Sequence, residues 1–234
     1  MYCHFSHPTC SGTNTLFNVY FLSLIIYPPA KCYGNAHPEG WEADDSPNPL
    51  TETGRRQADS LGKDWADTHI DHLLSSPLQR AHDTAKALSS HNTGHPEIVI
   101  NPLLVERRYG GKVYQLMQWN PTAATEELRG TSSYDYHLSR THCPAEGGES
   151  MSMVAARAHA IIRVILKDYA VNLSEAPECF LEKKTTDTPA DLPDGIPHVV
   201  IVSHNMFLME LYEKLYSWGR EHVETECNWR NAEW

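Results

Sequence analysis

Apolar residues along the chain follow two patterns, short runs of aliphatic and β-branched residues and longer segments with helical spacing. The short runs predict buried strands at 16–27, 72–76, 97–101 and 198–203. The helical spacing predicts amphipathic helices at 50–68, 78–90, 149–169 and 205–218. Thr51 is expected to cap the first of these helices, and Pro77 suits the first turn of the second.

The segments between these elements have a different composition. Polar stretches rich in proline predict surface loops at 28–49 and 174–197. Residues 112–146 mix aromatic side chains with Gly, Pro, Thr and Ser without a clean period, so we expect an inserted cap or lid there. Residues 228–233 look like the approach to a last strand or a tail.

Strands and helices alternate along most of the chain, which predicts the α/β class. We expect one domain over 1–234, a three-layer sandwich whose mostly parallel central sheet carries helices on both faces. Ligands of such folds bind beyond the carboxyl ends of the strands. The residues to examine are therefore 28–35, 75–80, 102–109 and 203–205.

Charge and composition limit the kinds of partner and the cellular location that we expect. The 234 residues include 30 acidic and 19 basic side chains, a formal net charge of -11, which argues against a nucleic-acid partner. The apolar run at 16–27 is too short to span a membrane, and residues 1–30 contain no Lys, Arg, Asp or Glu. This atypical N-terminal segment therefore lacks the basic region of a secretory signal. Six scattered cysteines indicate reduced thiols and a cytoplasmic location.

One cluster near the start offers metal ligands, namely Cys3, His4, His7 and Cys10. Its spacing matches no standard structural zinc site. We therefore expect a frayed N-terminus and no metal, with a zinc-binding module as the weaker alternative.

Three side chains at the predicted strand ends can carry chemistry. Arg80 lies in the first turn of a helix just after a strand, where a guanidinium and helix amides together bind phosphate. His204 directly follows the strand 198–203 and suits acid–base work or phosphate binding. Glu106, kept protonated by its surroundings, could protonate a leaving oxygen. Each has a plainer alternative: an exposed arginine, a structural histidine, or a surface glutamate paired with Arg107 or Arg108.

Five motifs in this order resemble the histidine phosphatase superfamily, also called the phosphoglycerate mutase-like family. The resemblance runs from about Leu50 to Asn205 and implies the phosphoglycerate mutase-like fold. It also implies hydrolysis of phosphomonoesters through a phosphohistidine, without metal or cofactor. The motifs are LTETGRRQA (50–58), SSPLQRAHDTA (75–85), VERRYGG (105–111), GGES (147–150) and VIVSHN (200–205).

Residue roles follow from this resemblance by position. Arg80 would be the second phosphate-binding arginine, His204 the second histidine, and Glu106 the proton donor. The substrate side would include Asn35, Arg107, Tyr109 and Asn205. The implied partner is a small phosphorylated substrate or ligand, and sugar phosphates, nucleotides and other small esters fit equally well. A phosphatase is favoured over a mutase, which needs a pocket that shields the phosphoenzyme from water.

The family's Arg-His-Gly signature after the first strand is absent. Counting back from Asn35 places it near 28–30, where this chain has Pro28-Pro29-Ala30. Three explanations stay open, in order of preference. The opening of the chain results from incorrect splicing or translation; the protein is a non-catalytic relative that binds a phosphorylated ligand; or His37, His4 or His7 replaces the nucleophile. Loss of the nucleophile would remove covalent catalysis.

Overall fold

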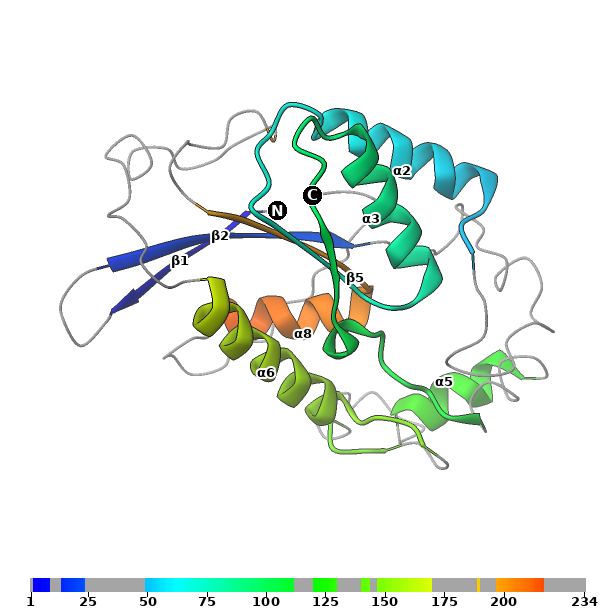
Figure 1. Ribbon diagram of the computed structural model, residues 1–234. Helices are drawn as coiled ribbons and strands as arrows, with labels where there is room; N and C mark the ends of the chain where they lie inside the picture. Colours follow the sequence, from blue (N-terminus) through cyan, green and yellow to red (C-terminus); the bar gives the residue numbers. More distant parts are fainter. Residues whose placement is uncertain are drawn as a thin grey trace.

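A five-stranded sheet forms the centre of the molecule (Figure 1). The computed structural model describes residues 2–8, 14–23, 49–111, 120–129, 140–143, 147–169, 189 and 197–216. Strands β2, β5, β3 and β4 pair in parallel, and β1 pairs antiparallel with β2 at one edge. In spatial order the strands are β1 (Tyr2–Pro8), β2 (Asn14–Ser23), β5 (His198–Ser203), β3 (His72–Ser75) and β4 (Ile98–Ile100).

Helices cover both faces of this sheet, which confirms the predicted three-layer α/β sandwich (Figure 1). Helices α2 (Glu52–Asp64) and α3 (Gln79–His91) lie on one face. Helices α6 (Met151–Tyr169) and α8 (Asn205–Tyr216) lie on the other. No helix in the described part of the chain is long and apolar enough to cross a membrane.

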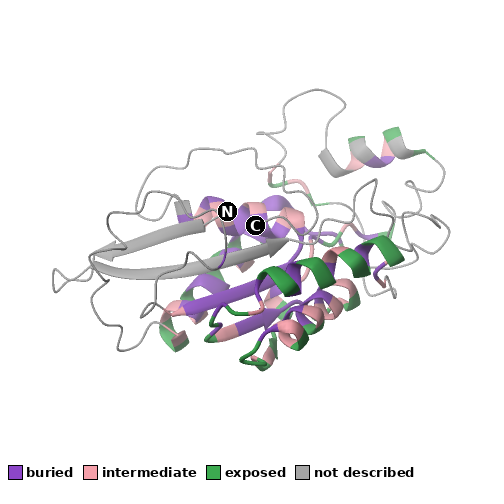
Figure 2. Ribbon diagram, turned by 90° about the horizontal axis from the view of Figure 1, so that it is seen from above, coloured by how far each residue is buried: buried purple, intermediate pink, exposed green. Residues whose placement is uncertain are grey.

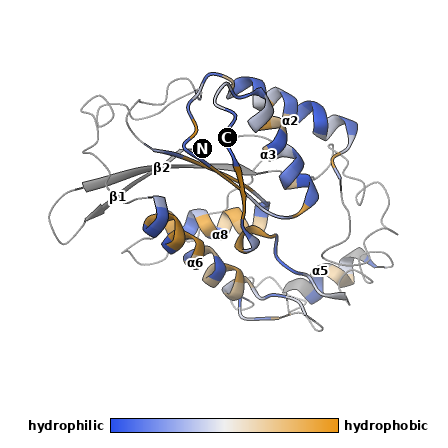
Figure 3. Ribbon diagram, viewed as in Figure 1, coloured by the Kyte–Doolittle hydropathy of each residue, from blue (hydrophilic) through white to orange (hydrophobic). Residues whose placement is uncertain are grey.

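Successive side chains of β5 point to opposite faces of the sheet and pack into both halves of the core. Val200 and Val202 pack with residues of α2 and α3, whereas Val199 and Ile201 pack with residues of α6 and α8. All six residues of β5 are buried, while the helices expose one side to solvent (Figure 2). The apolar residues of α6 and α8 form the second half of the core (Figure 3). The continuous apolar run at 198–203 is therefore the signature of a strand covered on both faces.

The predicted helix ends hold at some positions and shift at others. Thr51 caps α2, because its Oγ1 accepts a hydrogen bond from Gly54 N at 3.1 Å. Helix α3 begins after Leu78, so Pro77 precedes the helix and does not lie in its first turn. Helix α6 begins two residues later than predicted, because Ser150 Oγ accepts from Met153 N and acts as its cap.

The prediction of a frayed N-terminus is wrong. Residues 2–8 form β1, which pairs with β2 from Tyr2 opposite Tyr20 to Pro8 opposite Asn14. The uncharged segment supplies the partner that the edge of β2 would otherwise lack. Cys10 lies outside the described residues, and among those that are described no group of three or more His, Cys, Asp or Glu could hold a metal ion.

The predicted cap at 112–146 contains a helix that its irregular pattern did not indicate. Helix α5 (Pro121–Arg129) begins at a proline, which suits a first helical position. Within this region His142 Nε2 lies 2.7 Å from Glu127 O. Arg140 joins the region to α6 and α8, because its backbone O accepts from Ser152 N at 3.0 Å and its Nη2 donates to Glu210 Oε2 at 2.7 Å.

Parallel pairing brings four strand ends to one edge of the sheet. Ser75 is in register with Val202 and Ile100, and Ser23 is in register with Ser203. The segments that follow β2, β3, β4 and β5 therefore leave the sheet together. Three of these segments carry Arg80, Glu106 and His204.

Candidate active site

His204 lies at the junction between β5 and α8 and is only 1% exposed. Its Nε2 atom lies 2.9 Å from Ser76 Oγ, and its Nδ1 atom has no hydrogen-bond partner among the described residues. Burial, followed by the positive charges of Arg80 and Arg157, lowers the pKa of His204 well below its ordinary value of 6.5. The imidazole is therefore neutral at neutral pH, with one ring nitrogen that can bind a ligand.

Arg80 lies in the first turn of α3, directly after the segment that leaves β3. Its side chain is partly buried. The positive charge of Arg80 lowers the pKa of both His204 and Glu106, so the three groups share one electrostatic environment. A guanidinium at a helix N-terminus attracts phosphoryl oxygens through charge-assisted hydrogen bonds.

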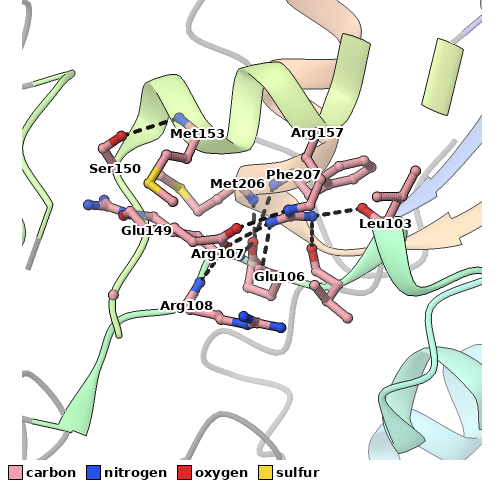
Figure 4. A network of polar contacts seen from close by, with 12 residues as sticks. Leu103, Glu106, Arg107, Arg108, Glu149, Ser150, Met153, Arg157, Met206 and Phe207 are labelled. Carbon is pink, nitrogen blue, oxygen red and sulfur yellow. Dashed lines mark hydrogen bonds and ion pairs between the residues drawn. The ribbon is translucent and has the colours of Figure 1, made fainter. Parts of the chain in front are cut away.

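Glu106 binds the N-terminus of α8 through its carboxylate (Figure 4). Its Oε1 accepts hydrogen bonds from Arg107 N at 2.8 Å and Phe207 N at 3.2 Å, and Met206 N lies 3.4 Å from Oε2. Burial raises the pKa of Glu106 above its ordinary 4.5, opposed by these amides and by Arg80. A carboxyl group that keeps its proton to a higher pH suits a general acid.

The other predicted site residues have different environments. Arg107 is buried, and its Nε donates to Glu149 O at 2.8 Å. Tyr109 is partly buried. Asn205 opens α8, and its Oδ1 has no hydrogen-bond partner within the described ranges. The structure thus brings Arg80, Glu106 and His204 together, while the roles of Arg107, Tyr109 and Asn205 on the substrate side stay predictions.

The remaining candidates lie either outside the described residues or away from this cluster. Asn35, His37 and the segment 28–30 lie outside the described residues. His4 and His7 lie on β1, in register with Asn18 and Thr15 of β2, toward the end of the sheet opposite His204. The position of a nucleophilic histidine stays a prediction.

Two further charged residues, the buried Glu149 and the half-buried Arg157, lie next to the site (Figure 4). Arg157 Nη2 lies 2.9 Å from Glu149 Oε2, and the two side chains are 13% and 11% exposed. A signal was available, because Arg157 follows Val154 by three residues and precedes Ile161 by four, which places it on the apolar face of α6. A cation that is largely shielded from solvent at such a position needs an anionic partner.

Residues 40–172 match the sequence model of the histidine phosphatase superfamily (branch 1), which is more than half of the chain. The chain belongs to the histidine phosphatase superfamily. Arg80, Glu106 and Glu149 lie inside the matched residues, whereas His204 follows them.

One similar relative is a phosphatase by name. The chain is 28% identical over 167 residues to fructose-2,6-bisphosphatase TIGAR B of Danio rerio. This alignment covers 68% of this chain but only 62% of the relative, so the chain spans less than two thirds of that protein's length.

Solved structures confirm the phosphoglycerate mutase-like fold. An alpha-ribazole phosphatase from Shigella flexneri has a TM-score of 0.56 at 20% identity, covering 85% of this chain and 83% of that one. A phosphoglycerate mutase from Bacillus anthracis has a TM-score of 0.55 at 20% identity, covering 83% and 78%. At these identities the likeness concerns the fold alone.

Proposed function

We propose that the chain is a phosphatase-type protein that binds the phosphoryl group of a small phosphomonoester between Arg80, Glu106 and His204 and hydrolyses the ester. One observation carries this proposal. The carboxyl group of Glu106 binds the first amides of α8, directly after the buried His204, and the charge of Arg80 acts on both. Family membership supports the same chemistry.

Each group has a distinct task in this reaction. Arg80 and the N-terminus of α3 neutralise the phosphoryl oxygens, and His204 donates a hydrogen bond to them. A histidine forms a P–N bond while the P–O bond to the leaving group breaks, and Glu106 gives its proton to the leaving oxygen. Water then cleaves the P–N bond. In this chain the attacking histidine would be His37, because 28–30 contains no histidine and the pairing of β1 leaves His4 and His7 toward the end of the sheet opposite His204.

Sugar phosphates are the first substrates to test, because TIGAR B is named as a fructose-2,6-bisphosphatase. The net charge of -11 favours a small phosphorylated partner over nucleic acid. We also propose a cytoplasmic location, which the scattered spacing of the six cysteines supports. We assign substrate choice to the cap at 112–146, which includes α5.

A second candidate is a non-catalytic protein that binds a phosphorylated ligand. The observation that favours it is the sequence Pro28-Pro29-Ala30, which stands near where counting back from Asn35 would put the family's nucleophile. The same three side chains would then bind the phosphoryl group without breaking an ester bond.

Turnover of p-nitrophenyl phosphate and fructose-2,6-bisphosphate tests the proposal. The wild-type chain is compared with Arg80→Ala, His204→Ala and a control, Arg56→Ala, which changes an exposed arginine of α2. We expect phosphate release that falls in the first two variants and stays unchanged in the control. Equal activity in all four proteins would refute the site. Saturable vanadate binding without turnover would favour the non-catalytic protein.

A further inference from the structure

One guanidinium holds the backbone of the segment that carries Glu106 (Figure 4). Arg157 Nη1 donates to Leu103 O at 2.7 Å and to Val105 O at 2.8 Å, and Nη2 lies 3.4 Å from Glu106 O. After the short helix η2 (Pro102–Leu104) this segment has no regular structure, so its carbonyl groups need partners from elsewhere. Arg157 supplies them from α6.

Glu149 binds the backbone on the C-terminal side of Glu106. Its carboxylate accepts two hydrogen bonds from Arg157, at 3.1 Å to Nε and 2.9 Å to Nη2. Its Oε2 also accepts from Arg108 N at 3.0 Å, and its own backbone N donates to Arg108 O at 2.8 Å. The backbone is therefore fastened both before and after Glu106. Two paired hydrogen bonds between a planar guanidinium and a carboxylate set a defined geometry.

Arg157 also contacts the helix end that binds the carboxyl group of Glu106. Its guanidinium carbon lies 5.0 Å from the centre of the Phe207 ring, a cation–π contact. The amide of the same Phe207 donates to Glu106 Oε1. One side chain thus touches the backbone of Glu106 and the residue that holds its carboxyl group.

We propose that Arg157 and Glu149 are positioning residues, which hold Glu106 against α8 so that its carboxyl group faces the leaving oxygen. This inference rests on the proposed function for the proton-donor role of Glu106, but the positioning can be measured without turnover. A displacement of about 1 Å at a reacting group costs on the order of 100-fold in rate. Neither Arg157 nor Glu149 needs to touch the substrate for this effect.

The first test measures Glu106 directly in the full chain. Carbon-13 NMR follows the titration of the Glu106 carboxyl group in the wild type, Arg157→Lys and Glu149→Gln. Arg163→Lys is the matched control, because Arg163 is exposed on the same helix. In both test variants we expect the pKa of Glu106 to fall toward its ordinary value, since burial is its main perturbation. Hydrogen exchange at the Met206 and Phe207 amides should become faster.

The second test uses the leaving group. A p-nitrophenolate leaves without a proton, whereas an alkoxide requires one. Arg157→Lys and Glu149→Gln should therefore lower kcat on an alkyl phosphate by on the order of 100-fold, with kcat on p-nitrophenyl phosphate and both KM values nearly unchanged.

The two tests separate the two ideas. An unchanged Glu106 titration and unchanged amide exchange in folded Arg157→Lys and Glu149→Gln would overturn the positioning role. Absence of turnover in the wild type would count against the proposed hydrolysis. The NMR titration would then decide by itself whether Arg157 and Glu149 position Glu106. Glu149→Gln keeps the size and one acceptor oxygen of the native side chain, and Arg157→Lys keeps the positive charge. If one of the two variants fails to fold, the other still tests the proposal.

Discussion

His204 Nε2 lies 2.9 Å from Ser76 Oγ, although the two residues are 128 positions apart in the sequence. Each residue directly follows a strand, His204 after β5 and Ser76 after β3. Ser76 N also donates to Val202 O at 2.9 Å, which extends the pairing of the two strands by one residue. The orientation of the His204 ring is thus set by the sheet itself, and its other nitrogen remains for a ligand.

Acidification should destabilise the wild type through His204. Its pKa in the folded state is well below 6.5, so between that pKa and 6.5 only the unfolded chain binds a proton at this residue. Its stabilising contribution is therefore complete above pH 6.5 and is lost as the pH falls, by up to about 1.4 kcal/mol per pH unit. Urea unfolding at pH values on both sides of 6.5 should show a steeper loss in the wild type than in His204→Gln. Equal slopes would contradict the buried neutral imidazole.

Glu106→Gln should remove proton donation while preserving shape. On an alkyl phosphate we expect kcat to fall by about 100- to 10,000-fold, with a smaller loss on p-nitrophenyl phosphate. Because burial raises the pKa of Glu106, the wild-type rate should decline only as the pH rises through that raised pKa, and the variant should lack this limb. Glu52→Gln, an exposed glutamate of α2, is the control. Similar losses on both substrates would speak against a general acid.

Arg140→Met should destabilise the fold strongly. Arg140 Nη2 lies 2.8 and 2.7 Å from the two carboxylate oxygens of Glu210, whose side chain is 2% exposed. Removing the arginine leaves a buried carboxylate without its charge partner, at a cost of about 3–5 kcal/mol. The double variant Arg140→Met with Glu210→Met should recover most of this loss. Chemical denaturation measures both, and a single variant no less stable than the double one would disprove the argument.

Gly62→Ala should loosen the packing of α2 on α3. A Cβ atom at this position would lie 2.8 Å from Ala87 O and 2.7 Å from His91 Cδ2. Overpacking costs about 1–3 kcal/mol, against a gain of about 1 kcal/mol from helix propensity, so we expect a net loss of about 1 kcal/mol. Thermal unfolding beside the exposed control Ser60→Ala checks this, and a more stable Gly62→Ala would show that the contact relaxes.

Strands and helices whose buried apolar residues recur with a clear period could be predicted from the sequence. Strand β5 was predicted with its observed bounds, because a run of β-branched residues between polar segments has few alternatives. The Thr51 cap was predicted because its hydrogen bond spans only three residues. Helix α5 could not be predicted at a definite place, since its nine residues offer only the pair Ala124 and Leu128 at helical spacing, between segments without a period.

The residues of the candidate site could be predicted from the sequence, but the contacts that hold them in place could be predicted only in part. Arg80, Glu106 and His204 follow strands, so the rule for strand ends located them. Arg157 acts on carbonyl groups about 50 residues earlier, and backbone acceptors carry no residue signature. Only its position in the apolar stripe of α6 indicated that it would be buried. The pairing of β1 with β2 was missed because a short uncharged terminus has no pattern that requires a strand.

Calorimetric titration with tungstate, a stable phosphate analogue, tests most directly whether these residues form one phosphoryl site. The wild type is compared with Arg80→Ala, His204→Gln and Lys86→Ala, where Lys86 is an exposed residue of α3 that pairs with Asp83. We predict saturable binding of one ion per chain, weakened on the order of 10- to 100-fold in Arg80→Ala and His204→Gln, because a charged hydrogen bond contributes about 1.5–3 kcal/mol. Lys86→Ala should bind like the wild type. No binding by the folded chain, or equal binding by all four proteins, would contradict the site.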